Sequence, residues 1–124
     1  VMPGLLLYDF GDMARTFCNN ALEEESAQKA FFRLNMFEAL CEGFFKGIKF
    51  SLSQAEIDSL KSGPWWMTYI MGIRFLADFI NGDIYYKISY ELQNLDRAKN
   101  QFSLLSDIEK KQSQIDQMVD MYYR

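Results

Sequence analysis

The sequence predicts an all-α fold, an irregular bundle of about five helices with a long C-terminal helix. Apolar residues recur at intervals of three and four through most of the chain, which is the spacing of one helix face. The segment Ser53-Gln54-Ala55-Glu56 is a capping-box pattern that marks a helix start. Of the 124 residues, 49% are hydrophobic, so the chain is long and apolar enough to form one domain around a core.

The first two helices are expected over residues 5–18 and 26–49. The acidic run Glu23-Glu24-Glu25 between them is expected to be a solvated connection. Each helix has an apolar stripe that should face the core. The stripes are Leu6, Phe10, Met13 and Phe17 in the first helix, and Ala30, Leu34, Phe37, Cys41, Phe44 and Ile48 in the second.

The next two helices are expected over residues 53–61 and 65–81, with Gly63-Pro64 as an interruption between them. The segment 65–81 is apolar nearly all round, which predicts a buried central helix. It is shorter than the roughly 20 residues that a membrane span needs, and it carries Arg74 and Asp78. Gly82 is expected to end it.

A tyrosine-rich connection over residues 83–93 precedes the last helix, which is expected to run from Asn94 to the chain end. Asn94 is expected to be the N-cap, and Asp96 places a negative charge in the first turn, where it complements the helix dipole. The apolar stripe of this helix is Leu95, Ala98, Phe102, Leu105, Ile108, Ile115, Val119 and Tyr122.

Composition excludes several classes of function. The net charge of -4 and the sequence pI of about 4.8 argue against binding to nucleic acid or to an anionic membrane. The chain has no histidine, so it cannot by itself build a catalytic triad or a histidine zinc site. It also has no glycine-rich phosphate motif. Cys18 and Cys41 are expected to be buried free thiols, which suits a reducing, cytoplasmic location.

Arg74 is the first candidate for a functional residue, because its neighbours are apolar and its guanidinium cannot lose its proton to escape burial. It could form an ion pair with Asp78, one turn further on. Alternatively, it could bind substrate oxygens in a polar pocket while Asp78 holds it in place. Tyr85 and Tyr86 could stack on a sugar ring or simply pack. Trp65 and Trp66 are expected in the core rather than on a ligand.

Asp9-Phe10-Gly11 matches the three-residue kinase motif whose aspartate holds magnesium. In kinases that motif follows a β-hairpin, whereas the residues before Asp9 look helical. The sequence therefore favours an aspartate that caps or braces a helix start. The chain begins on a Pro3-Gly4 turn without a signal-peptide pattern, which suggests that it is one part of a larger enzyme.

Several separated blocks resemble the C-terminal third of the aminoglycoside-phosphotransferase-like (choline-kinase-like) small-molecule kinases. Among these, the N-acetylhexosamine 1-kinase branch is the most similar. The blocks are residues 1–5 (VMPGL), 8–12 (YDFGD), 72–79 (GIRFLADF), 82–87 (GDIYYK), 94–97 (NLDR) and 101–102 (QF).

The resemblance implies the helical, substrate-binding C-terminal subdomain of a protein-kinase-like fold. The intact protein would transfer phosphate from ATP, with magnesium, to an N-acetylhexosamine. The catalytic base, the metal ligand and the nucleotide site would lie before Val1, so this chain would itself be inactive and would bind no ATP or metal. Arg74 and Tyr85 would bind the sugar, and Asp9 and Asp78 would give structural support.

Two alternatives remain. The chain could be a stand-alone helical protein-interaction module, and its exposed apolar surface could form a homo-oligomer. Relatives of the kinase branch have also been labelled mucin-desulfating proteins. The sequences around Cys18 and Cys41 do not match the Cys-x-Pro-x-Arg pattern of sulfatases, so the chain gives no support for that chemistry.

Overall fold

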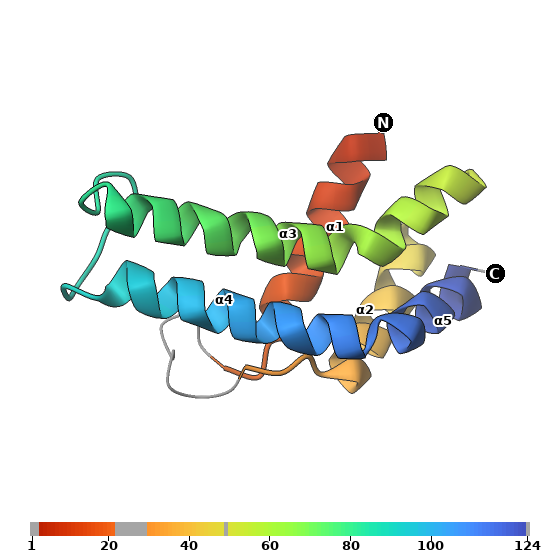
Figure 1. Cartoon of the computed structure of the whole chain (residues 1–124). Coiled ribbons are helices and arrows are strands. Elements are labelled where there is room, and N and C mark those ends of the chain that lie inside the picture. Colours follow the sequence, from red (N-terminus) through yellow and green to blue (C-terminus); the bar gives the residue numbers. More distant parts are fainter. Residues whose placement is uncertain (1–2, 22–29, 49, 124) are drawn as a thin grey trace.

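The computed structural model describes residues 3–21, 30–48 and 50–123, and it confirms the all-α fold. Its five helices are α1 (Pro3–Phe17), α2 (Leu34–Gly47), α3 (Gln54–Ile80), α4 (Gln93–Lys110) and α5 (Gln112–Tyr123). Helices α3 and α4 lie side by side and antiparallel, and α1 crosses α3 (Figure 1). Helix α5 packs against α2 at the end of the molecule away from the α3–α4 connection.

The predicted break at Gly63-Pro64 is wrong, because α3 runs without interruption from Gln54 to Ile80. The capping box at Ser53 is confirmed: its hydroxyl accepts from the Glu56 amide, and the Glu56 carboxylate accepts from the Ser53 amide. Pro64 removes one amide donor inside the helix, and the helix bends in its first half (Figure 1). Gly63 is buried where α1 crosses, and tertiary packing therefore keeps the helix intact there.

The predicted second helix is also wrong over residues 30–33, which are not helical, since α2 begins only at Leu34. Residues 22–29, which include the expected helix start at 26 and the acidic run, lie outside the described residues. Phe32 forms an isolated bridge with Asn19 and is extended. Its amide donates to the Asp107 carboxylate at 2.6 Å, and its carbonyl accepts from Lys111 Nζ at 2.8 Å. These two hydrogen bonds satisfy the amide and the carbonyl of Phe32, whose partners would otherwise come from a helix.

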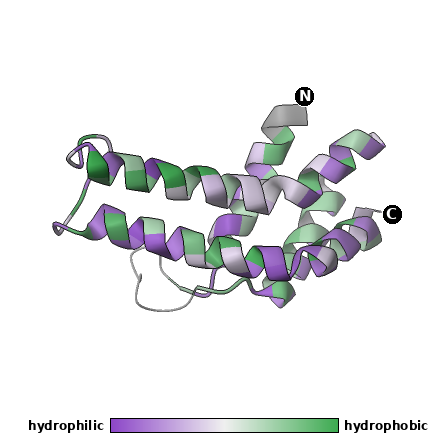
Figure 2. Ribbon diagram, in the orientation of Figure 1, coloured by the Kyte–Doolittle hydropathy of each residue, from purple (hydrophilic) through white to green (hydrophobic). Residues whose placement is uncertain are grey.

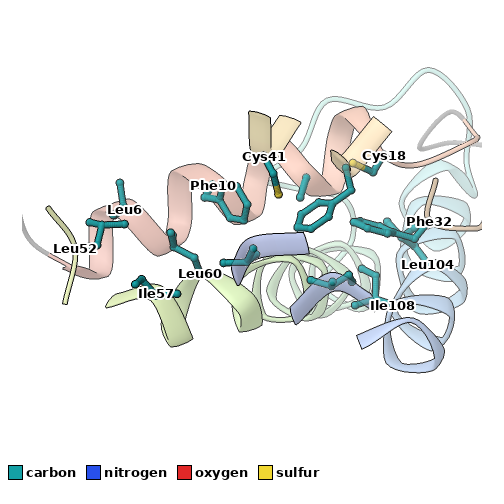
Figure 3. Close-up of a cluster of buried hydrophobic side chains, with 14 of the residues drawn as sticks. Leu6, Phe10, Cys18, Phe32, Cys41, Leu52, Ile57, Leu60, Leu104 and Ile108 are labelled. Atoms are coloured by element: carbon teal, nitrogen blue, oxygen red, sulfur yellow. The ribbon is translucent and has the colours of Figure 1, made fainter. Parts of the chain in front are cut away.

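One hydrophobic core joins α1, α2, the first half of α3 and the C-terminal helices (Figure 3). Phe10 is completely buried, and its ring lies against Phe37 and Phe44 of α2, with centroids 5.7 and 4.9 Å away. The predicted stripe of α1 is only partly right. Phe17 is 56% exposed, and the buried row continues from Phe10 through Ala14 and Cys18 instead.

The prediction of buried free thiols is confirmed for both cysteines. Cys18 and Cys41 are free and fully buried in the core. Burial raises the pKa of each thiol to about 12, which leaves both side chains neutral and unreactive.

The long C-terminal helix is present, with one turn residue, Lys111, dividing it into α4 and α5. The Lys111 amide still donates to the carbonyls of Asp107 and Ile108, so the helical hydrogen bonding nearly continues through the division. The predicted cap is wrong. Helix α4 begins at Gln93, and Asn94 lies inside its first turn with its side chain buried.

The part of α3 from residue 65 onward is not buried all round, contrary to expectation. One side packs against α1 and α4, while the opposite side leaves Trp66 46% exposed and Ile80 73% exposed. Trp65 is half-buried and donates from Nε1 to the Glu109 carboxylate at 3.0 Å. In the part of the chain that the structure describes, no helix is both long and apolar enough to cross a membrane.

Candidate functional site

Figure 1 shows the end of the molecule where α3 connects to α4. The side chains at this end enclose a groove of about 380 Å³. It contains four of the residues that the sequence marks as functional or supporting candidates: Arg74, Asp78, Tyr85 and Tyr86. Its full lining is Arg74, Ala77, Asp78, Asn81, Tyr85 and Tyr86. The last two turns of α3 form one wall, and the tyrosine-rich connection forms the other.

Asp78 fixes the connection that carries the tyrosines. Its two carboxylate oxygens accept from the backbone amides of Tyr85 at 2.7 Å and Tyr86 at 3.0 Å. The Asn94 side chain of α4 donates to the same carboxylate at 2.8 Å. Burial on its own raises the pKa of the Asp78 carboxyl, but the hydrogen bonds from these amides and from Asn94 outweigh it, so the pKa lies below its usual value.

The turn after α3 places the connection over the groove. Gly82 ends the helix as predicted, with φ of 95°, a left-handed conformation that glycine adopts without strain. Asp83 follows with φ of 61°, and its amide donates to the Asp78 carbonyl at 2.8 Å. The Asp83 carboxylate accepts from Asn94 Nδ2 at 3.0 Å. Asn94 therefore joins α3, the turn and α4 through one buried amide.

Arg74 does not pair with Asp78. It is exposed, and among the residues that the structure describes it has no ion-pair or hydrogen-bond partner. The structure has neither of the two arrangements considered for Asp78, an ion pair with Arg74 or a contact that holds Arg74 in place, because the Asp78 oxygens accept from Tyr85, Tyr86 and Asn94. The guanidinium of Arg74 is left with its donors available to a ligand in the groove.

Aromatic rings form the opposite side of the groove. Tyr85 is 81% exposed, and its ring meets Tyr86 edge-on, with centroids 4.9 Å apart. The Tyr86 ring in turn lies 4.9 Å from that of Phe75, and the Arg97 guanidinium lies 5.5 Å from the Phe75 centroid. Tyr86 and Phe75 thus anchor the wall, while Tyr85 offers a free face for stacking.

The groove can bind, but it has no carboxylate that is available to act as a base. Asp78 is 6% exposed, and its oxygens accept several hydrogen bonds. Hydrogen-bond donors come from Arg74 and Asn81, and stacking surface comes from Tyr85. Over residues 3–21, 30–48 and 50–123, the structure has no cluster of His, Cys, Asp or Glu that could hold a metal ion.

Asp9 lies elsewhere, inside α1 and on its exposed side. It is well past Pro3, so it does not cap the helix start as the sequence suggested. Asn81 and Asn94, by contrast, contribute to the site without having been predicted for it. Asn81 is the C-cap of α3, and the expected capping role of Asn94 obscured its contact with Asp78.

A second hollow of about 400 Å³ lies between α3 and α5 and is chemically different. Lys61 in its lining is already paired with Asp58 at 3.3 Å and with Asp120 at 3.0 Å. The hollow has no aromatic lining residue.

No protein-family model matches the chain.

Proposed function

We propose that this chain is the C-terminal, sugar-holding part of an ATP-dependent kinase that phosphorylates an N-acetylhexosamine at its anomeric hydroxyl. The sugar would bind in the groove between Arg74 and Tyr85. The observation that supports this most is their convergence. The resemblance to sugar kinases implies that both residues face the sugar, and both line one groove at the end of α3.

The chemistry of the groove suits a monosaccharide. An exposed tyrosine ring offers an apolar face for the C–H side of a sugar, and its phenol offers a hydroxyl. Arg74 and Asn81 supply donors for hydroxyl or acetamido oxygens. A volume of about 380 Å³ lies near the lower end of ligand sites, roughly 300–1,000 Å³, which fits one sugar ring better than a longer glycan.

The part played by this chain would be binding rather than phosphoryl transfer. Kinases of this type catalyse by positioning the nucleophile and by neutralising charge on the phosphates with magnesium and basic residues. In the proposal, the base, ATP and magnesium are held by protein that precedes Val1. The isolated chain should therefore not phosphorylate N-acetylglucosamine. ATP-dependent phosphorylation by these residues alone would refute the proposal that this chain only binds the sugar.

The kinetic test uses the intact protein. We expect Arg74→Ala to raise the KM for the sugar about tenfold, equivalent to roughly 1.4 kcal/mol of lost binding, and to leave the KM for ATP unchanged. Tyr85→Ala should act in the same direction. Ile84→Ala is the matched control, because Ile84 is 82% exposed, adjoins Tyr85 in the same connection and does not line the groove. If Arg74→Ala leaves the KM for the sugar unchanged, Arg74 does not bind the sugar.

A binding test uses the chain itself. In a ¹⁵N-labelled sample, N-acetylglucosamine should shift the backbone amides of Tyr85 and Tyr86, and Arg74→Ala should weaken the effect. Because Asp78 accepts from both amides, these signals report directly on the wall of the groove. Shifts confined to other parts of the chain would place the sugar elsewhere.

A stand-alone interaction module is the second candidate, favoured by the exposed apolar side of α3. Trp66, Tyr69 and Ile73 are 46, 38 and 43% exposed. The coding sequence upstream of Val1 separates the two candidates. A catalytic loop that ends in Asn, followed by an Asp-x-Asp pair, supports the kinase, whereas an unrelated segment supports the module.

A further inference from the structure

The exposed side of α3 carries a regular apolar stripe that the sugar site does not use. Its members alternate in spacing by three and four residues, which is the pattern of a two-helix seam. Figure 2 shows green bands repeating along α3 toward its connection with α4. The stripe consists of Trp66, Tyr69, Ile73, Leu76 and Ile80.

The side chains of the stripe are exposed for contact, and some of them are already held in place before any partner binds. Four of its members are between 38 and 73% exposed, and Leu76 is half-buried. The Tyr69 ring stacks on Trp65 at 5.1 Å, and Trp66 meets Tyr69 edge-on at 6.2 Å. Trp65 is itself held by Glu109 of α4. Rings fixed in this way lose little rotational freedom on binding.

Within α3, the residues that border the stripe carry no charge, and the Glu109 carboxylate of α4 lies beyond them, where it accepts from Trp65 Nε1. The bordering residues are Trp65, Gly72 and Phe79 on one side and Ile70 and Ala77 on the other. Paired helices that select a different partner usually do so with charged residues at these bordering positions. Their absence favours a partner with the same uncharged face, and a second copy of the chain supplies a stripe of matching length and polarity.

We infer that two copies of this chain associate through their α3 stripes in an antiparallel, two-fold arrangement centred near Ile73. Antiparallel pairing sets the bulky end at Trp66 and Tyr69 against the smaller end at Ala77 and Ile80 of the partner, and it opposes the helix dipoles. The pairing goes beyond the sugar site and does not depend on it.

The area of the stripe sets the strength of this pairing. From their exposed fractions, the four most exposed members present roughly 400 Å² of apolar surface per copy, within the range of large patches on monomers. Two copies would bury about 800 Å² plus the borders, which is at the low end for specific interfaces. The dimer should therefore be weak and reversible.

Sedimentation analysis of the whole chain from about 5 to about 500 µM spans micromolar dissociation constants. The average mass should rise with concentration from 14.6 kDa toward twice that value. Ile73→Glu and Ile80→Glu should weaken association at least tenfold. Ile84→Glu is the matched control and should associate like the unchanged chain, because Ile84 is 82% exposed but lies outside α3.

Two results would overturn the inference: a chain that stays monomeric over this range, or glutamate variants that associate normally. If Ile73→Glu fails to fold by circular dichroism, Ile80→Glu decides alone, since Ile80 is 73% exposed and packs little. Under mild oxidation, Ile73→Cys should form a disulfide-linked dimer and Trp66→Cys should not. Cross-linking through both would show a parallel pair and refute the antiparallel arrangement. The native cysteines are buried and do not compete.

Discussion

Replacing Gly11 by alanine tests the close crossing of α1 and α3. A Cβ atom at Gly11 would lie 2.7 Å from the Gly63 carbonyl carbon and 2.8 Å from Met67 Cγ, and closer still to the Gly63 carbonyl oxygen. Since the nearest atoms belong to backbone, they cannot rotate away, and the two helices must separate. Overpacking of this kind costs typically 1–3 kcal/mol, and here we expect about 3 kcal/mol because backbone must move.

The intrinsic helix preference of alanine offsets part of this cost. Alanine is favoured over glycine inside a helix by about 1 kcal/mol, so Gly11→Ala should lower the free energy of unfolding by about 2 kcal/mol in all. Gly43→Ala is the matched control in α2, where a Cβ would have no neighbour within 4 Å. At Gly43 only the helix preference of alanine acts, so the free energy of unfolding of this variant should rise by about 1 kcal/mol.

Thermal unfolding followed by circular dichroism measures both changes. For a chain of this size, 1 kcal/mol corresponds to about 4 °C in Tm, so Gly11→Ala should lower Tm by about 8 °C and Gly43→Ala should raise it by about 4 °C. Urea unfolding should give the same signs. A Gly11→Ala variant as stable as Gly43→Ala would show that α1 does not approach α3 at Gly63, and the reasoning would fail.

Three further outcomes follow from the core and the site. Phe10→Ala should lower the free energy of unfolding by about 3–5 kcal/mol in urea, because Phe10 is fully buried among aromatic rings; a loss under 1 kcal/mol would contradict that packing. Cys18 and Cys41 should resist a thiol reagent at pH 8 and react fully in denaturant, since burial raises each pKa to about 12; rapid reaction in the folded chain would contradict their burial. Asp78→Asn should destabilise the chain at pH 7. The difference in free energy of unfolding from the unchanged chain should shrink as the pH falls below about 4. The reason is that a carboxyl whose pKa is lowered by folding contributes stability above its unfolded pKa and loses that contribution in acid. A difference in urea unfolding that does not change between pH 7 and pH 3 would show that the ionised Asp78 carboxylate is not what holds the connection.

Local signals in the sequence predicted the features that depend on neighbouring residues. The capping box at Ser53, the stop at Gly82 and the buried stripe through Phe37 and Cys41 all appear in the structure. Each is determined within a few residues, by a hydroxyl that reaches an amide, by a permitted φ or by helical spacing.

Features set by distant residues could not be predicted in this way. Pro64 looked like a helix boundary, but packing around Gly63 and Gly11 keeps α3 continuous. Asp78 looked like the ion-pair partner of Arg74 because the two lie one turn apart. Its actual partners come from the following connection and from Asn94, and no spacing rule connects them to Asp78. Sequence could name Arg74, Tyr85 and Tyr86 as candidates for the groove, but neither Asn81 nor which polar atoms remain available there.

Lys111 has a consequence for the cooperativity of the chain. Together with Asp107 it satisfies both the amide and the carbonyl of Phe32, and its ammonium lies 5.4 Å from the Phe31 ring centroid. The segment that leads into α2 is therefore anchored near the other end of the sequence. A chain shortened before Lys111 would lose more than α5, since the entry to α2 would lose its anchor as well. Early and late parts of this sequence should consequently unfold as one unit.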